Sequence, residues 1–184
     1  MRHCSKKRQF AALMNLAPYI DHTLLRPDAT TQEIIKLCSE AIDADFAAVC
    51  VPPYFVREAA RQLEGKAPKL ATVIGFPFGY SLATVKATEA EMAILSGADE
   101  LDMVINIAAL KSGDWRTLET EIREILEIVK LRGKKLKVIV ESGMLSEEEL
   151  SRCCEFYGRF YIDYLKTSTG YAATGATLVA VSTM

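Results

Sequence analysis

Several features are missing from this sequence, and each absence excludes a class of protein. Every apolar run is interrupted by Lys, Arg, Asp or Glu before it reaches the roughly 18 residues of a membrane-spanning helix. The formal net charge is only −2, so the chain offers no electrostatic footprint for nucleic acid. The five cysteines lack the paired spacing of a metal site, and their odd number fits a reducing compartment. We therefore expect a cytoplasmic protein that binds neither a membrane nor nucleic acid.

The composition is that of a globular domain. Of the 184 residues, 50% are hydrophobic and 25% are charged, enough apolar material for one well-filled core. Residues 1–13 differ from the rest, because they carry four basic residues and no acid, and their apolar stretch is too short for a signal peptide. We expect an N-terminal extension at residues 1–13 and a single domain at residues 14–184.

Short apolar runs alternate with amphipathic segments, which predicts repeated βα units and a parallel sheet. Strands are expected at residues 20–23, 46–51, 70–75, 100–106, 136–141 and 161–167. Helices are expected at residues 54–63, 85–95, 115–131 and 176–184, and after the two capping boxes Thr30/Glu33 and Ser146/Glu149. About six βα units result, where a closed (β/α)8 barrel has eight. An open doubly wound sheet would also fit this number, but no glycine fingerprint follows the first strand.

Polar residues enter three successive strands on the same parity. Side chains on a strand alternate between its two faces, so residues two apart share a face. Leu101 and Met103 share the face that suits helix packing, which leaves Asp102 on the opposite face. The same parity places Lys137 and Lys166 on the interior face of the next two strands. All three side chains are expected in one interior, near the C-terminal mouth where barrel enzymes hold their catalytic groups.

This combination suggests Schiff-base chemistry. An amine beside another cation in a dry pocket has a lowered pKa, which frees the neutral form that attacks a carbonyl. A nearby carboxylate such as Asp102 could move the protons that carbinolamine formation requires. Any one of these residues alone would more often belong to a solvated edge or a structural ion pair.

Six segments, in this order, resemble the deoxyribose-phosphate aldolase family. They are Tyr19-Ile-Asp-His-Thr-Leu-Leu-Arg-Pro-Asp-Ala-Thr30, Ala48-Val-Cys-Val51, Thr72-Val-Ile-Gly-Phe-Pro77, Gly97-Ala-Asp-Glu-Leu-Asp-Met-Val-Ile-Asn106, Leu136-Lys-Val-Ile-Val-Glu141 and Leu165-Lys-Thr-Ser-Thr-Gly170. The resemblance covers nearly everything from Leu16 to Thr177. It implies an α/β TIM barrel and a class I aldolase that uses neither a metal nor another cofactor. Its members reversibly cleave 2-deoxy-D-ribose 5-phosphate into D-glyceraldehyde 3-phosphate and acetaldehyde.

The resemblance also implies residue roles. Lys166 corresponds to the Schiff-base lysine, Asp102 to the aspartate that relays protons, and Lys137 to a lysine of the same pocket. Residues that contact or flank the substrate in the family correspond to Cys50, Thr23 and Thr169. Parity and resemblance thus agree on Asp102 and Lys166.

Two family segments have no counterpart here: a seventh-strand segment with a second essential lysine, and a Gly-Thr-Ser-like eighth strand, whose loops hold the phosphate. We therefore expect the barrel domain to be incomplete at its C-terminus. An alternative function is a catalytically impaired barrel fragment that persists through a partner or as a homo-oligomer, since open sheet edges favour self-association. A barrel isomerase acting on sugar phosphates is a further alternative, but enediol chemistry needs no amine nucleophile such as Lys166.

Overall fold

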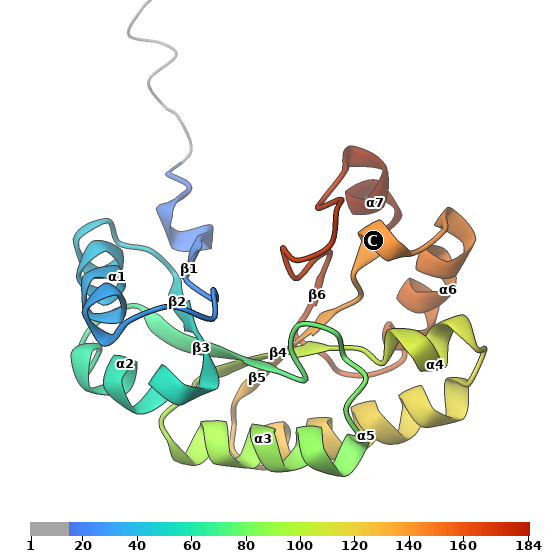
Figure 1. The fold of residues 1–184 in the computed structure, drawn as a ribbon, viewed down its shortest axis with the longest axis horizontal. Helices are drawn as coiled ribbons and strands as arrows, with labels where there is room; N and C mark the ends of the chain where they lie inside the picture. The colour runs from blue at the N-terminus through green and yellow to red at the C-terminus, as the bar shows by residue number, and fades with distance from the viewer. Residues whose placement is uncertain (1–14) are drawn as a thin grey trace, which may run out of the picture.

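The structure is a computed structural model that describes residues 15–184, so the extension expected at residues 1–13 lies outside the described residues. Its centre is a parallel sheet of six strands in the order β1-β2-β3-β4-β5-β6 (Figure 1). The strands are β1 (Asp21–Thr23), β2 (Ala48–Val51), β3 (Lys69–Ile74), β4 (Glu100–Val104), β5 (Lys135–Ile139) and β6 (Tyr164–Lys166). All six predicted strands are present, and each pairs with the next along the chain.

Helices follow the strands and cover the outer face of the sheet (Figure 1). They are α1 (Thr31–Asp43), α2 (Val56–Gln62), α3 (Ala83–Leu95), α4 (Ile107–Lys111), α5 (Trp115–Leu131), α6 (Glu147–Tyr157) and α7 (Leu178–Thr183), with short 3-10 turns η1 (Ala17–Tyr19), η2 (Pro53–Phe55) and η3 (Ser142–Met144). Both predicted capping boxes form, at the starts of α1 and α6. Within residues 15–184, none of the helices combines the length and the apolar character that crossing a membrane requires.

Two predicted strands end two residues earlier than expected. The strand predicted to reach residue 106 stops at Val104, because the Asn106 side chain accepts a hydrogen bond from the backbone N–H of Ala109 and starts the unpredicted helix α4. The strand predicted to reach residue 141 stops at Ile139, and Glu141 adopts a left-handed backbone with φ of 52°. In both places a local turn replaces the extended backbone that the apolar pattern suggested.

The sheet curls strongly about its own axis. The Lys137 Nζ on β5 lies 2.8 Å from Asp21 Oδ2 on β1. A flat sheet would hold these strands about 19 Å apart at the usual strand spacing. Beyond the strands, the Tyr171 hydroxyl donates a hydrogen bond of 2.9 Å to the carbonyl oxygen of Leu25, so the loops after β6 and β1 also meet. This curl confirms the predicted α/β barrel type of architecture, here with six strands.

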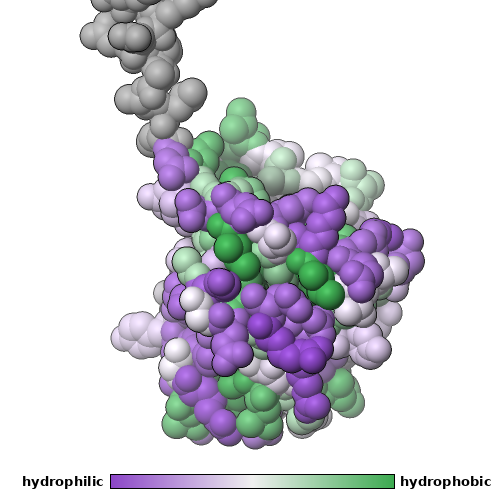
Figure 2. All heavy atoms as spheres, turned by 90° about the vertical axis from the view of Figure 1, so that its left-hand side faces the viewer, coloured by the Kyte–Doolittle hydropathy of each residue, from purple (hydrophilic) through white to green (hydrophobic). Residues whose placement is uncertain are grey.

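The two faces of the curled sheet have different surroundings. On its outer face Leu101, Met103, Leu136 and Val138 are fully buried against the helices, as parity predicted. On its inner face a small apolar cluster of Cys50, Ala71 and Val73 lies beside charged side chains. The outside of the helix layer is mostly hydrophilic on the side of α1 and α2 (Figure 2). The inner face thus gathers the buried charged side chains of Glu100, Asp102 and Lys137.

Candidate active site

Four strands, β1, β4, β5 and β6, bring five charged side chains together inside the curled sheet. Asp102 and Lys137 are directly paired in the β4–β5 register, so their side chains point into the interior at the same height. Lys137 Nζ lies 2.6 Å from Glu100 Oε2, 2.8 Å from Asp21 Oδ2 and 3.3 Å from Asp102 Oδ1. The other oxygen of Asp102 accepts a hydrogen bond from the amine of Lys166. One carboxylate thus contacts both lysines.

The two lysines differ in their access to solvent. Lys166 is the last residue of β6 and pairs with Ile139, so it lies nearer the C-terminal mouth than Lys137. Its side chain is 31% exposed, compared with 6% for Lys137 and 1% for Asp102. A hollow of about 420 Å³ opens between the loops that follow β1, β2, β3 and β6. One of its lining residues is Val73, which pairs with Asp102 in the β3–β4 register. Of the two amines, that of Lys166 is the one a small molecule can reach.

Three carboxylates determine the charge of Lys137. Burial alone would lower the pKa of Lys137, but Asp102, Asp21 and Glu100 outweigh it and raise this pKa far above its usual value. Lys137 therefore favours its charged form, in contact with three carboxylates. Strand parity could not show this, because parity does not reveal how many acids surround one amine.

Two members of this cluster were not singled out from the sequence, although a signal existed for each. Glu100 was on the interior parity of β4, and Asp21 lies in the Tyr19–Thr30 segment that carries the resemblance. Asp21 was missed because its contact with Lys137 joins residues 116 positions apart. Only the curl of the sheet makes that contact possible.

The remaining predicted residues lie around the cluster. Cys50 is 1% exposed on the inner face, where burial, followed by the charge of Asp102, raises the pKa of its thiol to about 12. Thr23 ends β1, and its hydroxyl donates to the carbonyl oxygen of Asp21 at 2.9 Å. Thr169 follows β6, but its hydroxyl and its backbone N–H both donate to Glu141 rather than to any group of the cluster. Cys50 therefore adjoins the charged groups, whereas the side chain of Thr169 is held by a different carboxylate.

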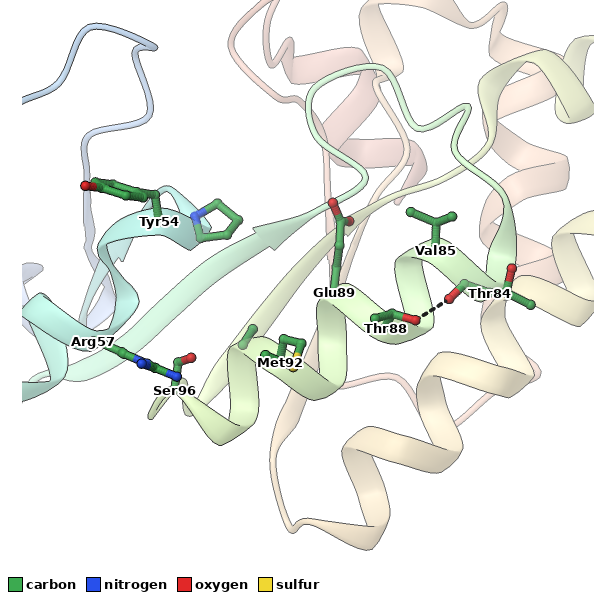
Figure 3. Close-up of a pocket in the computed structure, with 10 residues that line it drawn as sticks. Tyr54, Arg57, Thr84, Val85, Thr88, Glu89, Met92 and Ser96 are labelled. Carbon is green, nitrogen blue, oxygen red and sulfur yellow. Dashed lines mark hydrogen bonds between the residues drawn. The ribbon is translucent and has the colours of Figure 1, made fainter.

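A larger hollow of about 710 Å³ lies elsewhere, outside the sheet. Figure 3 shows Tyr54 and Arg57 on one side of it and Val85, Glu89 and Met92 of α3 on the other. None of the five charged residues of the interior cluster lines it. Volume therefore does not single out the inner face, and the converging charges are what make it the candidate active site.

Comparison with known proteins shows the family to which the chain belongs. Residues 16–184 match the family described as DeoC/LacD family aldolase. The chain is 48% identical to deoxyribose-phosphate aldolase 1 of Cutibacterium acnes over 171 residues, which are 93% of this chain and 78% of that protein. It is 49% identical to a deoxyribose-phosphate aldolase of Thermococcus gammatolerans over 173 residues, which are 93% of this chain and 77% of that protein.

A solved structure also shares the fold. The tetrameric deoxyribose-phosphate aldolase of Aeropyrum pernix superposes with a TM-score of 0.83 at 33% identity, over 91% of this chain and 70% of that chain. Family match, sequence identity and fold thus coincide with an amine and a carboxylate in contact at the mouth of a curled parallel sheet. From its sequence and its fold, this chain belongs to the DeoC/LacD family of aldolases.

Proposed function

We propose that this protein is a Schiff-base aldolase that reversibly cleaves 2-deoxy-D-ribose 5-phosphate to D-glyceraldehyde 3-phosphate and acetaldehyde. The observation that carries the proposal is the contact of Lys166 with Asp102, an accessible amine against a carboxylate that is 1% exposed. A buried carboxylate in contact with an amine can take its proton and return it to a leaving oxygen. The relatives named for this substrate support the choice of sugar.

The reaction follows from these two groups. Neutral Lys166 attacks the C1 aldehyde of the open-chain sugar, and loss of water from the carbinolamine leaves an iminium ion. Removal of the proton from the C3 hydroxyl breaks the C2–C3 bond, releases glyceraldehyde 3-phosphate and leaves an enamine on Lys166. Protonation of the enamine carbon and hydrolysis release acetaldehyde and restore the amine. Asp102 is assigned the proton transfers, because it is the carboxylate in contact with Lys166.

Lys137 is assigned a different role in the same pocket. With Asp21, Glu100 and Asp102 around it, Lys137 is charged and cannot act as the nucleophile. It holds one oxygen of Asp102 while the other faces Lys166. Cys50, Thr23 and Thr169 are proposed to border the substrate, Cys50 from the inner face and the two threonines from the strand ends.

The assignment of the nucleophile can be tested by trapping. Acetaldehyde and sodium borohydride should reduce the Schiff base to a stable ethyl adduct, which peptide mass mapping should place on Lys166. Lys166→Met should abolish the adduct, whereas Lys69→Met, which removes an exposed lysine at the start of β3, should leave it unchanged. An adduct confined to Lys137 would overturn the assignment.

Two further proposals concern the setting of the enzyme. We propose that it acts in the cytoplasm, where its free cysteines stay reduced and sugar phosphates are available. We also propose that it forms a homo-oligomer, because β1 and β6 each pair on one side only among residues 15–184 and the Aeropyrum pernix relative is a tetramer. Fractionation of the producing cells and light scattering of the purified protein would test these two points.

A further inference from the structure

A second buried ion pair lies outside the sheet, away from the proposed active site. Lys86 of α3 and Glu121 of α5 form a hydrogen-bonded ion pair, and their side chains are 0% and 1% exposed. The proposed reaction uses neither residue. A fully buried lysine is rare and has to be explained by what its amine binds.

The pair binds the backbone at the end of β4. The amine of Lys86 donates a second hydrogen bond, of 2.8 Å, to the carbonyl oxygen of Val104, the last residue of the strand. The second carboxylate oxygen of Glu121 accepts from the backbone N–H of Asn106 at 3.3 Å. The two charged groups therefore bind backbone groups on both sides of Ile105.

The backbone carbonyl of Val104 lacks a strand partner on the β3 side. The N–H of Ile105 donates to Ile139 of β5, so the preceding carbonyl of Val104 faces the β3 side. The last β3–β4 pair is Ile74 with Met103, and at Gly75 the chain leaves the sheet with φ of +62°. Lys86 thus supplies the hydrogen bond that β3 no longer provides.

Gly75 makes room for this lysine. A Cβ atom at Gly75 would lie 2.5 Å from the Lys86 Cε, so a side chain there would displace the lysine stem. The backbone N–H of Gly75 is also bound, at 2.7 Å, by Glu89, one helical turn along α3 from Lys86. Helix α3 therefore holds the carboxyl ends of both β3 and β4.

The surroundings of the pair are dry. Burial lowers the pKa of Lys86 and raises the pKa of Glu121, while each partner's charge opposes the shift. Burial also raises the pKa of the Tyr157 hydroxyl, which lies near Glu121 and has no hydrogen-bond partner among the described residues. A buried ion pair is seldom the most stable choice for a core, because apolar residues of similar volume often do as well. Its value here lies in the directed hydrogen bonds to β4.

We propose that Lys86 and Glu121 are positioning residues for Asp102. Asp102 shares its strand face with Val104, two residues further along β4, so a shift of the strand end moves the carboxylate that contacts Lys166. The pair fixes that end through Val104 and Asn106 without contacting the substrate. This inference rests on the proton-transfer role of Asp102 in the proposed function.

The double variant Lys86→Met/Glu121→Gln tests the proposal. Each single change leaves an unpaired buried charge and risks unfolding. The double change removes both charges and deletes the donor to Val104, while it keeps the length of the Glu121 side chain and shortens that of Lys86 by one atom. Lys111→Met is the matched control, because it removes one partner of an ion pair with Glu149 that lies on the surface.

Two reactions of acetaldehyde separate binding from proton transfer. Borohydride trapping measures Schiff-base formation at Lys166, and incorporation of deuterium from heavy water into the methyl group measures enamine formation. For the double variant we expect an equal yield of adduct but deuterium incorporation about 10-fold slower or more, since small misplacements of a reacting group carry large kinetic penalties. Amide hydrogen exchange at Ile105 and Asn106 should become faster. The control should match the unmodified chain in every measurement.

Each outcome decides something. Unchanged deuterium incorporation in a folded double variant would overturn the positioning role and leave the pair purely structural. Adduct yield and deuterium incorporation that both fall in proportion to the folded fraction would also overturn the positioning role. If the unmodified chain forms no adduct at Lys166, the proposed function fails, and the inference fails with it.

Discussion

At the scale of single residues, the candidate site depends on one carboxylate with two different neighbours. One oxygen of Asp102 faces Lys137, a lysine that three carboxylates keep charged. The other faces Lys166, whose side chain reaches the open mouth. We therefore propose different roles for the two lysines: Lys137 holds Asp102 in place, and Lys166 reacts with the substrate.

Asp102→Asn should separate catalysis from folding. The amide has the same shape but cannot take up the Lys166 proton, so kcat should fall by roughly 100-fold or more in any active form of the protein. Lys137 keeps two carboxylate partners, Asp21 and Glu100, so the melting temperature should change little.

Glu100→Gln is the matched control for this prediction. It also removes a carboxylate from Lys137 but leaves the contact between Asp102 and Lys166 in place. Its kcat should therefore fall far less. If Asp102→Asn instead lost activity in proportion to its folded fraction, the residue would be structural.

At the scale of elements, two aspartates that directly precede strands join neighbouring strands of the sheet. Asp99, before β4, accepts hydrogen bonds from the backbone N–H of Leu70 on β3 and from Lys134. Asp163, before β6, accepts hydrogen bonds from the backbone N–H of Leu136 on β5 and from Lys130. Both aspartates lie at the amino ends of the strands, opposite the candidate site, so we assign their hydrogen bonds to the stability of the fold.

The hydrogen bonds of Asp163 predict a contribution to stability that is lost in acid. Burial would raise the pKa of Asp163, but the hydrogen bonds from Lys130 and Leu136 outweigh it and lower this pKa below its usual value. A lowered folded-state pKa stabilises the fold above the unfolded-state pKa of about 3.9, and this stability is lost as the pH falls through the folded-state value.

Asp163→Asn should therefore lower the free energy of unfolding at pH 7 by about 0.5–1 kcal/mol, a range that allows for solvent screening of a partly exposed group. Urea denaturation at pH 7 and at about pH 3 measures the difference, which should shrink toward zero at the lower pH. Asp43→Asn is a suitable control, because Asp43 makes no side-chain hydrogen bond or ion pair within residues 15–184. A difference that persisted unchanged in acid would contradict this account.

At the scale of the whole molecule, the described sheet has two edges. Strands β1 and β6 each pair with one neighbour, and Tyr161 and Tyr164 at the β6 edge are 88% and 52% exposed. Unpaired strand edges attract other chains, whereas a closed barrel has none. The contact of Lys137 with Asp21 spans the sheet but leaves both edges open.

A polypeptide of these 184 residues alone should therefore self-associate and catalyse poorly. Lys137 contacts three carboxylates and cannot take the place of the second lysine that the resemblance implies. Light scattering and the rate of deoxyribose phosphate cleavage would be compared with a version extended by a family-like C-terminal segment. A cooperatively melting monomer that cleaves the sugar at a comparable rate would refute this expectation.

The sequence by itself determined the features that depend on local periodicity. The capping boxes of α1 and α6 formed as predicted, because each needs only residues three apart. The predicted helix at residues 115–131 matches α5. Strand parity brought Asp102, Lys137 and Lys166 to the inner face, because alternation of faces is a property of any extended chain.

The tertiary structure alone decided which charges meet. The contact of Asp21 with Lys137 requires a sheet that curls, and no pattern within a single strand carries that information. Lys86 is buried because β3 ends before β4 and leaves a carbonyl group to be bound, whereas composition would place a lysine in solvent. Periodicity assigns a side chain to a face, but its charge state and partners depend on groups brought close from distant strands, and only the packed fold brings them there.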